Sequence, residues 1–214
     1  MIDHYWLGID ISLRSPAFAL LTPQGNWYIL AFAQSTSQYT RLHNTLLANH
    51  RITLATPIPM LIRDRDKTCV LHNVKRFDYI VYTMQIWLNT YVPDIQHLRV
   101  CFEGYAFSKI TNAFSTTLHE LCGVIQLRLF QLGVRSLHTI TPSTWKVRTV
   151  GTDTGRNKYA AVEYVRTHGP QVDLLTLFGH DVTTITPKKC PHPIQDIADA
   201  IGVLLGHRQS IHGV

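Results

Sequence analysis

The sequence lacks the features that mark several large classes of protein. It has no run of about 18 apolar residues, so no membrane span is predicted. Its beginning does not show the charged start and cleavage site of a signal peptide. Its four cysteines form no C-x-x-C pair, so the sequence indicates neither a disulfide framework nor a zinc site with that spacing. These absences favour a reducing, cytoplasmic compartment.

Acidic residues are also fewer than basic ones. The 214 residues include 14 Asp and Glu against 20 Lys and Arg, and the net charge is +6. This moderate excess favours a polyanionic partner over an acidic or neutral ligand. The length leaves room for one ordinary domain with a well-buried core. We therefore expect a single domain that carries an insertion.

Hydrophobic patterning predicts an α/β fold. Apolar runs at residues 5–12, 15–21 and 27–33, with a Pro-Gln-Gly-Asn turn before the third, predict an antiparallel meander. Two further strands alternate with helices along the rest of the chain. We expect these strands at residues 98–102 and 134–140, and helices at residues 39–49, 77–91, 111–131, 156–168 and 194–206.

Four acids stand where these predicted elements begin or end. Asp10 closes the first apolar run and Glu103 follows the fourth, while Asp196 and Asp199 share one face of the last helix. An ordinary alternative is that Asp196 is a first-turn acid favoured by the helix dipole and Asp199 a solvated neighbour. A sheet ordered 3-2-1-4-5 would place Asp10 beside Glu103. Because an unpaired buried carboxylate is costly, acids beside core segments suggest a shared cation.

The ligand type indicates which cation and which chemistry. Carboxylate and water oxygens suit Mg²⁺ or Mn²⁺, whereas Zn²⁺ favours histidine and cysteine. Two such ions can orient and deprotonate a water on one side of a phosphodiester and stabilise the leaving oxygen on the other. No covalent nucleophile is then needed. The acids therefore predict metal-dependent phosphodiester hydrolysis.

The sequence resembles the RuvC-type Holliday junction resolvases of the RNase H-like superfamily. The resemblance runs in order along nearly the whole chain outside residues 35–75. Any one motif is weak, whereas five in order are fairly specific. The motifs are Gly8-Ile9-Asp10, Phe102-Glu103-Gly104-Tyr105-Ala106-Phe107, Leu121-Cys122-Gly123-Val124-Ile125, Thr141-Pro142-Ser143-Thr144-Trp145-Lys146 followed by Gly151, Gly155 and Lys158, and Asp196-Ile197-Ala198-Asp199-Ala200.

This resemblance implies an RNase H-like fold with a five-stranded mixed sheet, ordered 3-2-1-4-5 and flanked by helices. It implies a homodimer that nicks a four-way DNA junction symmetrically during recombination, repair or genome processing. The dimer would be joined through the 111–131 helix, whose wide apolar arc could alternatively serve core packing alone. Two Mg²⁺ ions per site, replaceable by Mn²⁺, would be held by Asp10, Glu103, Asp196 and Asp199. No small-molecule cofactor and no membrane are implied. The expected setting is the cytoplasm of a bacterial or phage-infected cell.

The resemblance also suggests residues that contact DNA. Lys158 matches the family lysine near the scissile phosphate, although the loop before it is one residue longer than usual; the alternative is a solvated helix charge. Tyr105 or Phe107 would be the aromatic wedge that opens the junction, unless these residues belong to the core. Phosphate contacts are expected from basic residues of the same regions. These are Lys109, Lys146, Arg148, Arg156 and Lys158.

Three features depart from the family pattern or lie outside it. The surplus at about residues 35–75 would be the insertion, which could lengthen the sheet edge or touch DNA. Glu120, on the 111–131 helix, is either a fifth acid near the metals or, as we favour, an exposed charge. His180, Cys190 and His192 lack the fourth ligand and tight spacing of a zinc site.

Other functions share parts of this pattern. An RNase H-like nuclease acting on RNA–DNA hybrids, flaps or other branched DNA would use the same acids, and dimerisation would separate it from a junction resolvase. Gly8-Ile9-Asp10 followed by Ser12 also resembles the first phosphate loop of actin-like ATPases and sugar kinases. Those chains are much longer and carry a second glycine-rich loop, for which residues 151–155 are a poor candidate. A catalytically silent DNA-binding module would be indicated by the loss of an acid.

Overall fold

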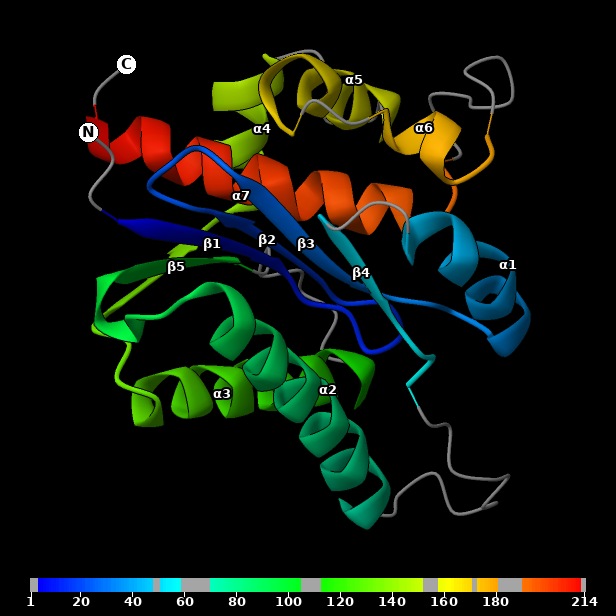
Figure 1. Ribbon diagram of the computed structural model, residues 1–214. Helices are drawn as coiled ribbons and strands as arrows, with labels where there is room; N and C mark the ends of the chain where they lie inside the picture. Colours follow the sequence, from blue (N-terminus) through cyan, green and yellow to red (C-terminus); the bar gives the residue numbers. More distant parts are fainter. Residues whose placement is uncertain are drawn as a thin grey trace.

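The computed structural model describes residues 4–47, 51–58, 70–104, 113–151, 158–170, 173–180 and 190–212. Within them, a mixed sheet of six strands in the order β4-β3-β2-β1-β5-β6 lies between two layers of helices (Figure 1). The strands are β1 (Tyr5–Asp10), β2 (Ala17–Leu21), β3 (Trp27–Phe32), β4 (Ile52–Ala55), β5 (Leu98–Glu103) and β6 (Ser136–Ile140). The helices are α1 (Thr36–Leu47), α2 (Val70–Tyr91), α3 (Ala113–Gln131), α4 (Pro142–Val150), α5 (Lys158–His168), α6 (Leu174–Leu177) and α7 (Ile194–His212), with a short 3₁₀ helix at Ile95–His97.

The direction of the strands sets which residues meet at one edge. β1, β2 and β3 form the antiparallel meander, and Gly25 adopts a φ of 83° in the turn before β3, where a residue without a Cβ is favoured. β4 runs parallel to β3, while β5 runs parallel to β1 and β6 to β5. Five strands therefore point the same way. Their carboxyl ends, at Asp10, Phe32, Ala55, Glu103 and Ile140, form one edge of the sheet, which we call the carboxyl edge.

Strand alternation divides the core between the two faces of the sheet. On β5, Val100 and Phe102 pack in the cluster that α2 and α3 cover, whereas Cys101 belongs to the cluster beneath α7. On β1, Leu7 and Ile9 face α2 and α3, and Trp6 faces α7. By the same alternation, Asp10 and Glu103 lie on the α7 face. Figure 1 shows α7, α4 and α5 on one side of the sheet and α2 and α3 on the other.

The predicted fold class and strand order are confirmed, with one correction. The sequence pattern predicts five strands, which is one too few, because β4 adds a sixth beside β3. α1 and β4 both fall within residues 35–75, so this segment lengthens the sheet, as one of the two expectations stated. Several helices are longer than predicted: α2 begins seven residues earlier than 77, and α7 continues to His212. Among the helices of the described ranges, none is long and apolar enough to cross a membrane.

Candidate active site

The four predicted acids come from three elements that meet at the carboxyl edge. Asp10 ends β1, Glu103 ends β5, and Asp196 and Asp199 occupy the first two turns of α7. Because Ile9 pairs with Phe102, the next residues along the two parallel strands are Asp10 and Glu103. Asp10, Asp196 and Asp199 are only 9%, 6% and 9% exposed. The structure therefore concentrates negative charge in a largely buried place.

The acids of this cluster interact strongly with one another. Burial raises the pKa of Asp10 well above its ordinary value, and the charges of Glu103, Asp199 and Asp196 and a hydrogen bond with Glu103 raise it further. The pKa of Asp199 is raised to about 7, chiefly by burial and then by Glu103, while Lys146 and a hydrogen bond from Gln195 act in the opposite direction. The cluster therefore resists carrying its full negative charge alone.

Gly8 allows α7 to approach β1 closely enough to bring the acids together. A Cβ at Gly8 would lie 2.2 Å from the backbone oxygen of Ala200 and 2.8 Å from Cβ of Leu204. Real Cβ atoms do not come this near to other atoms, so any larger residue would push α7 away from the sheet. The glycine of the Gly-Ile-Asp motif thus has a packing role. It sets the distance between the strand that carries Asp10 and the helix that carries Asp196 and Asp199.

Trp145 links the acid cluster to the packing of α4 on α7. The side chain of Thr141 caps α4 by accepting from the backbone N–H of Thr144, at 3.2 Å. Trp145, in the first turn, is fully buried, and its indole Nε1–H donates to Oε1 of Glu103 at 2.8 Å. A Cβ at Gly202 would lie 2.4 Å from its ring. The missing side chain on α7 is thus what accommodates the tryptophan that orients Glu103.

Two further side chains that the sequence analysis did not assign to the site contact its acids. Nδ1 of His192 lies 2.8 Å from Oδ2 of Asp196, and Nε2 of Gln195 donates to Oδ2 of Asp199 at 3.4 Å. Each partner precedes its acid by four residues. For Gln195 and Asp199, which both lie on α7, this spacing was a signal in the sequence, because residues four apart are neighbours on a helix surface. His192 precedes α7, so its contact with Asp196 had no such signal.

Comparison with known proteins supports the fold. No protein-family model and no curated protein matches the chain. Among solved structures, Thermus thermophilus RuvC in complex with a Holliday junction substrate matches with a TM-score of 0.55 at 15% identity, over 98% of this chain and 96% of that one. A second structure of Thermus thermophilus RuvC matches with a TM-score of 0.53, at the same identity and coverage. The chain has a RuvC-type fold.

In this RuvC-type fold, the predicted DNA-contacting residues are described only in part. Lys146 lies 5.0 Å over the ring of Trp145 and acts electrostatically on Asp199, so it borders the acid cluster. Arg148 is exposed and donates to the backbone oxygen of Gly206, two turns or more beyond the acids along α7. Lys158 begins α5, but its side chain is outside the description. Tyr105, Phe107, Lys109 and Arg156 lie outside the described residues altogether.

The donor chemistry of the cluster fits a divalent cation with oxygen ligands. Four carboxylates come together here, and three of them are nearly inaccessible to water. Among the described residues, the positive charge of Lys146 acts on Asp199. Such an arrangement is stabilised by Mg²⁺ or Mn²⁺, which prefer these ligands. Within the described ranges, no three Asp, Glu, His or Cys side chains converge on a single point as they stand. The types of these residues and their location therefore suit a divalent cation. Their side chains would have to move closer together to coordinate it.

Two other expectations are resolved on the described residues. Glu120 is exposed on α3, on the face of the sheet opposite α7, which agrees with a solvated charge. His192 contacts Asp196, so one of the three residues considered for zinc adjoins the acid cluster instead.

Proposed function

We propose that this chain is a metal-dependent, structure-selective endonuclease that resolves four-way DNA junctions by paired symmetric nicks. The observation that carries the proposal is the cluster of Asp10, Glu103, Asp196 and Asp199 at the carboxyl edge of a RuvC-type fold. One of the solved structures with this fold contains a Holliday junction. A net charge of +6 agrees with a polyanionic substrate.

The four acids would hold the metal ions, which would supply an activated water and stabilise the leaving oxygen. The chain's own residues orient the acids for this task. The indole N–H of Trp145 holds one carboxylate oxygen of Glu103. His192 contacts Asp196, and Gln195 donates to Asp199. Lys146 brings a positive charge to the border of the cluster, where a substrate phosphate would be attracted. Lys158, at the start of α5, is proposed as a second contact near the scissile phosphate.

Two symmetric nicks require two sites, and the far side of the sheet offers a surface for a second copy of the chain. On α2, Tyr82 and Ile86 are 61% and 50% exposed, and on α3 Leu127 and Phe130 are 57% and 63% exposed. A contiguous exposed apolar surface often marks an interaction site, and these four side chains are exposed on two helices that contact each other. Arg128 of α3 donates to Oε1 of Gln85 of α2, at 2.6 Å, which ties the two helices together. We propose that this α2–α3 surface forms the homodimer.

Cleavage of synthetic DNA tests the proposal. A four-way junction labelled on each strand in turn is incubated in Mg²⁺ beside a linear duplex, a flap and an RNA–DNA hybrid, with Asp10→Asn as the inactive control. We expect nicks at symmetric positions on two opposing strands of the junction, and none in the linear duplex. Asp10→Asn should bind the junction without cutting it. Cleavage of the hybrid or flap with an intact junction would instead support the broader RNase H-like activity.

A further inference from the structure

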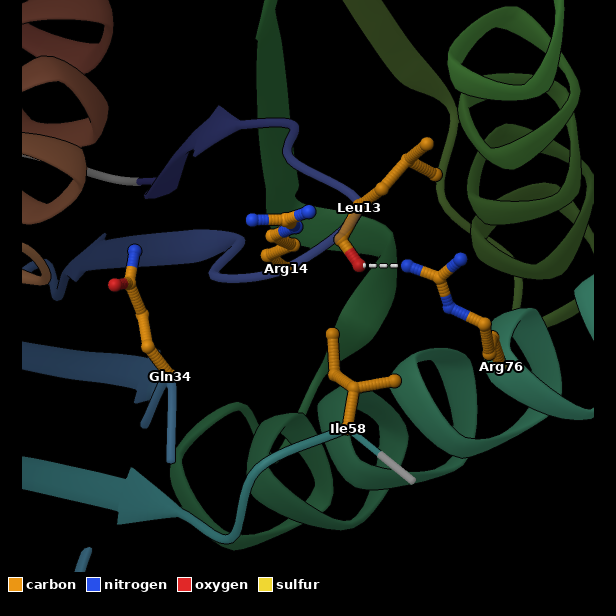
Figure 2. A pocket seen from close by; sticks show the side chains of 5 residues that line it. All are labelled: Leu13, Arg14, Gln34, Ile58 and Arg76. Atoms are coloured by element: carbon orange, nitrogen blue, oxygen red, sulfur yellow. Dashed lines mark hydrogen bonds between the residues drawn. The ribbon is translucent and has the colours of Figure 1, made fainter. Parts of the chain in front are cut away.

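A pocket lined by two arginines lies at the carboxyl edge, on the side of the sheet that α2 covers. It has a volume of about 160 Å³. Figure 2 shows the side chains of Leu13, Arg14, Gln34, Ile58 and Arg76 around it. None of these five residues is acidic. The proposed catalytic steps use none of them, so the pocket needs an explanation of its own.

The two arginines are close enough to repel each other. The pKa of Arg76 is lowered by partial burial and by the charge of Arg14. Arg76 donates through Nη2 to the backbone oxygen of Leu13, but its buried Nε has no hydrogen-bond partner among the residues that the structure describes. Two guanidinium groups that line one pocket, with no acid among the described residues of its lining, favour an anion between them. The forked donors of arginine match the oxygens of a phosphate group.

The position of the pocket relates it to the acid cluster. Arg14 follows Asp10 by four residues, so the two α-carbons cannot be more than about 14 Å apart. Gln34 and Ile58 follow β3 and β4, whose carboxyl ends share the edge with that of β1. A duplex strand rises by roughly 3.4 Å per nucleotide, so this separation corresponds to about four nucleotides or fewer. A strand crossing the edge can therefore reach both places.

The lining also suits a sugar-phosphate backbone more than a free ion. Leu13 and Ile58 are buried apolar residues of the lining, and Gln34 adds an amide on the side away from Arg76 in Figure 2. The pocket has room for several water molecules, each of which occupies about 30 Å³ in the liquid. Arg14 is exposed, so the pocket is open to a ligand that arrives from solvent. Ile58 follows β4, so β4, the strand that the sequence pattern does not predict, helps to position the pocket lining.

We propose that Arg14 and Arg76 bind a backbone phosphate of the DNA strand that enters the acid cluster, a few nucleotides from the bond to be cut. This inference rests on the proposed function, because it takes the substrate to be branched DNA. It adds a binding site that neither the acids nor the expected basic residues supply.

The experiment measures junction binding as a function of salt in the non-cleaving Asp10→Asn background. Arg14→Gln should weaken binding about tenfold, because it removes hydrogen bonds to a charged group. The slope of log K against log salt should become less negative by about 0.9, the value for one phosphate that the protein no longer neutralises. Arg14→Lys should keep most of the slope. Arg135→Gln is the matched control, since Arg135 is exposed just before β6, at the opposite end of the strands, and its slope should stay unchanged.

A second arm locates the phosphate. Single uncharged methylphosphonates are placed one to six nucleotides from the cleavage position. One or two of them should weaken binding to the Asp10→Asn parent, which keeps Arg14. The same substitutions should cause no further loss of affinity in the variant that also carries Arg14→Gln. If Arg14→Gln leaves the salt slope unchanged while the junction still binds, the pocket proposal is wrong and the proposed function stands. If no methylphosphonate couples to Arg14, the pocket does not hold the DNA backbone. If the parent protein does not bind the junction at all, both proposals are wrong.

Discussion

The indole N–H of Trp145 donates a 2.8 Å hydrogen bond to Oε1 of Glu103, across 42 positions of sequence. Trp145 is fully buried, and its ring lies where a Cβ on Gly202 of α7 would be. One side chain therefore joins the packing of α4 on α7 to the orientation of a proposed metal ligand. Packing and catalysis should be coupled at this point.

Loss of the indole N–H of Trp145 should weaken metal-dependent cleavage more than it destabilises the fold. Trp145→Phe keeps an aromatic ring on Gly202 but leaves Glu103 without its donor. We expect the Mg²⁺ concentration for half-maximal cleavage to rise about tenfold, as for loss of a partner that orients a metal ligand. Junction affinity in Ca²⁺ should not change. Trp87→Phe is the matched control, because Nε1 of Trp87 is buried on the other side of the sheet and has no hydrogen-bond partner in the described part of the chain. An equal rise in both variants would contradict the positioning role of Trp145.

The glycine of the Gly-Ile-Asp motif should be intolerant of even a methyl group. Gly8→Ala would place a Cβ 2.2 Å from the backbone oxygen of Ala200, so α7 must move. We expect the free energy of unfolding to fall by about 1–3 kcal/mol, as for overpacked cores, with weaker stabilisation by Mg²⁺. Urea unfolding measures the change, and a neutral Gly8→Ala would show that α7 is not held this close.

The acid cluster should make the metal-free protein less stable as the pH rises. Asp199 has a pKa raised to about 7 from its ordinary value of 3.8, so the folded state retains a proton that the unfolded chain has released between these values. The stability that protonated Asp199 contributes is fully present below pH 4 and is lost as the pH rises through 7. In EDTA, Asp199→Asn should therefore match the wild type at pH 4 and exceed it by about 1–3 kcal/mol at pH 8.

Comparing the wild type with Asp199→Asn cancels the contributions of other titrating groups to the pH dependence, because both proteins contain them. His207, whose pKa is lowered to about 4 chiefly by burial, titrates in the opposite sense but is present in both proteins. Mg²⁺ at pH 8 should raise the melting temperature of the wild type and have little effect on Asp199→Asn, because a ligand that binds the folded state stabilises it. A difference between the two proteins that does not depend on pH would contradict this account of the cluster.

The α2–α3 surface should hold two copies together. Phe130→Asp places a charge on the most exposed of its large apolar side chains, at 63%. We expect sedimentation to show a monomer, and cleavage to yield single nicks without pairing, while Mg²⁺ still raises the melting temperature. Ile211→Glu, at the end of α7 on the other side of the sheet and 41% exposed, is the control that should remain dimeric. A wild type that is already monomeric would remove the basis for paired nicks.

The sequence predicted most of the frame of the site, for a physical reason. Asp10 and Glu103 each end an apolar run long enough to be a buried strand, so their meeting at one edge follows from strand direction. Asp196 and Asp199 follow from helical spacing. β4 was missed because it is a four-residue strand in a segment of weak pattern, and its pairing with β3 arises from tertiary structure.

The contacts that orient the acids were harder to predict. The bond from Trp145 to Glu103 depends on how closely α4 packs on α7, and no local periodicity encodes that distance. The glycines at positions 202 and 206 gave a partial signal, because small residues four apart on a helix allow close packing; both lie against Trp145. The Arg14–Arg76 pocket joins the end of β1 to α2, 62 positions further along the chain, and nothing local marks it.

The most direct test of the central claim is cleavage of a supercoiled plasmid that extrudes a cruciform, in Mg²⁺, followed by gel electrophoresis. If two acid clusters act together on one junction, supercoiled circles should convert to linear DNA cut at the cruciform without accumulation of nicked circles. Glu103→Gln should leave the plasmid intact while still binding it. Accumulation of nicked circles alone, or an intact cruciform beside efficient cleavage of an RNA–DNA hybrid, would contradict the account.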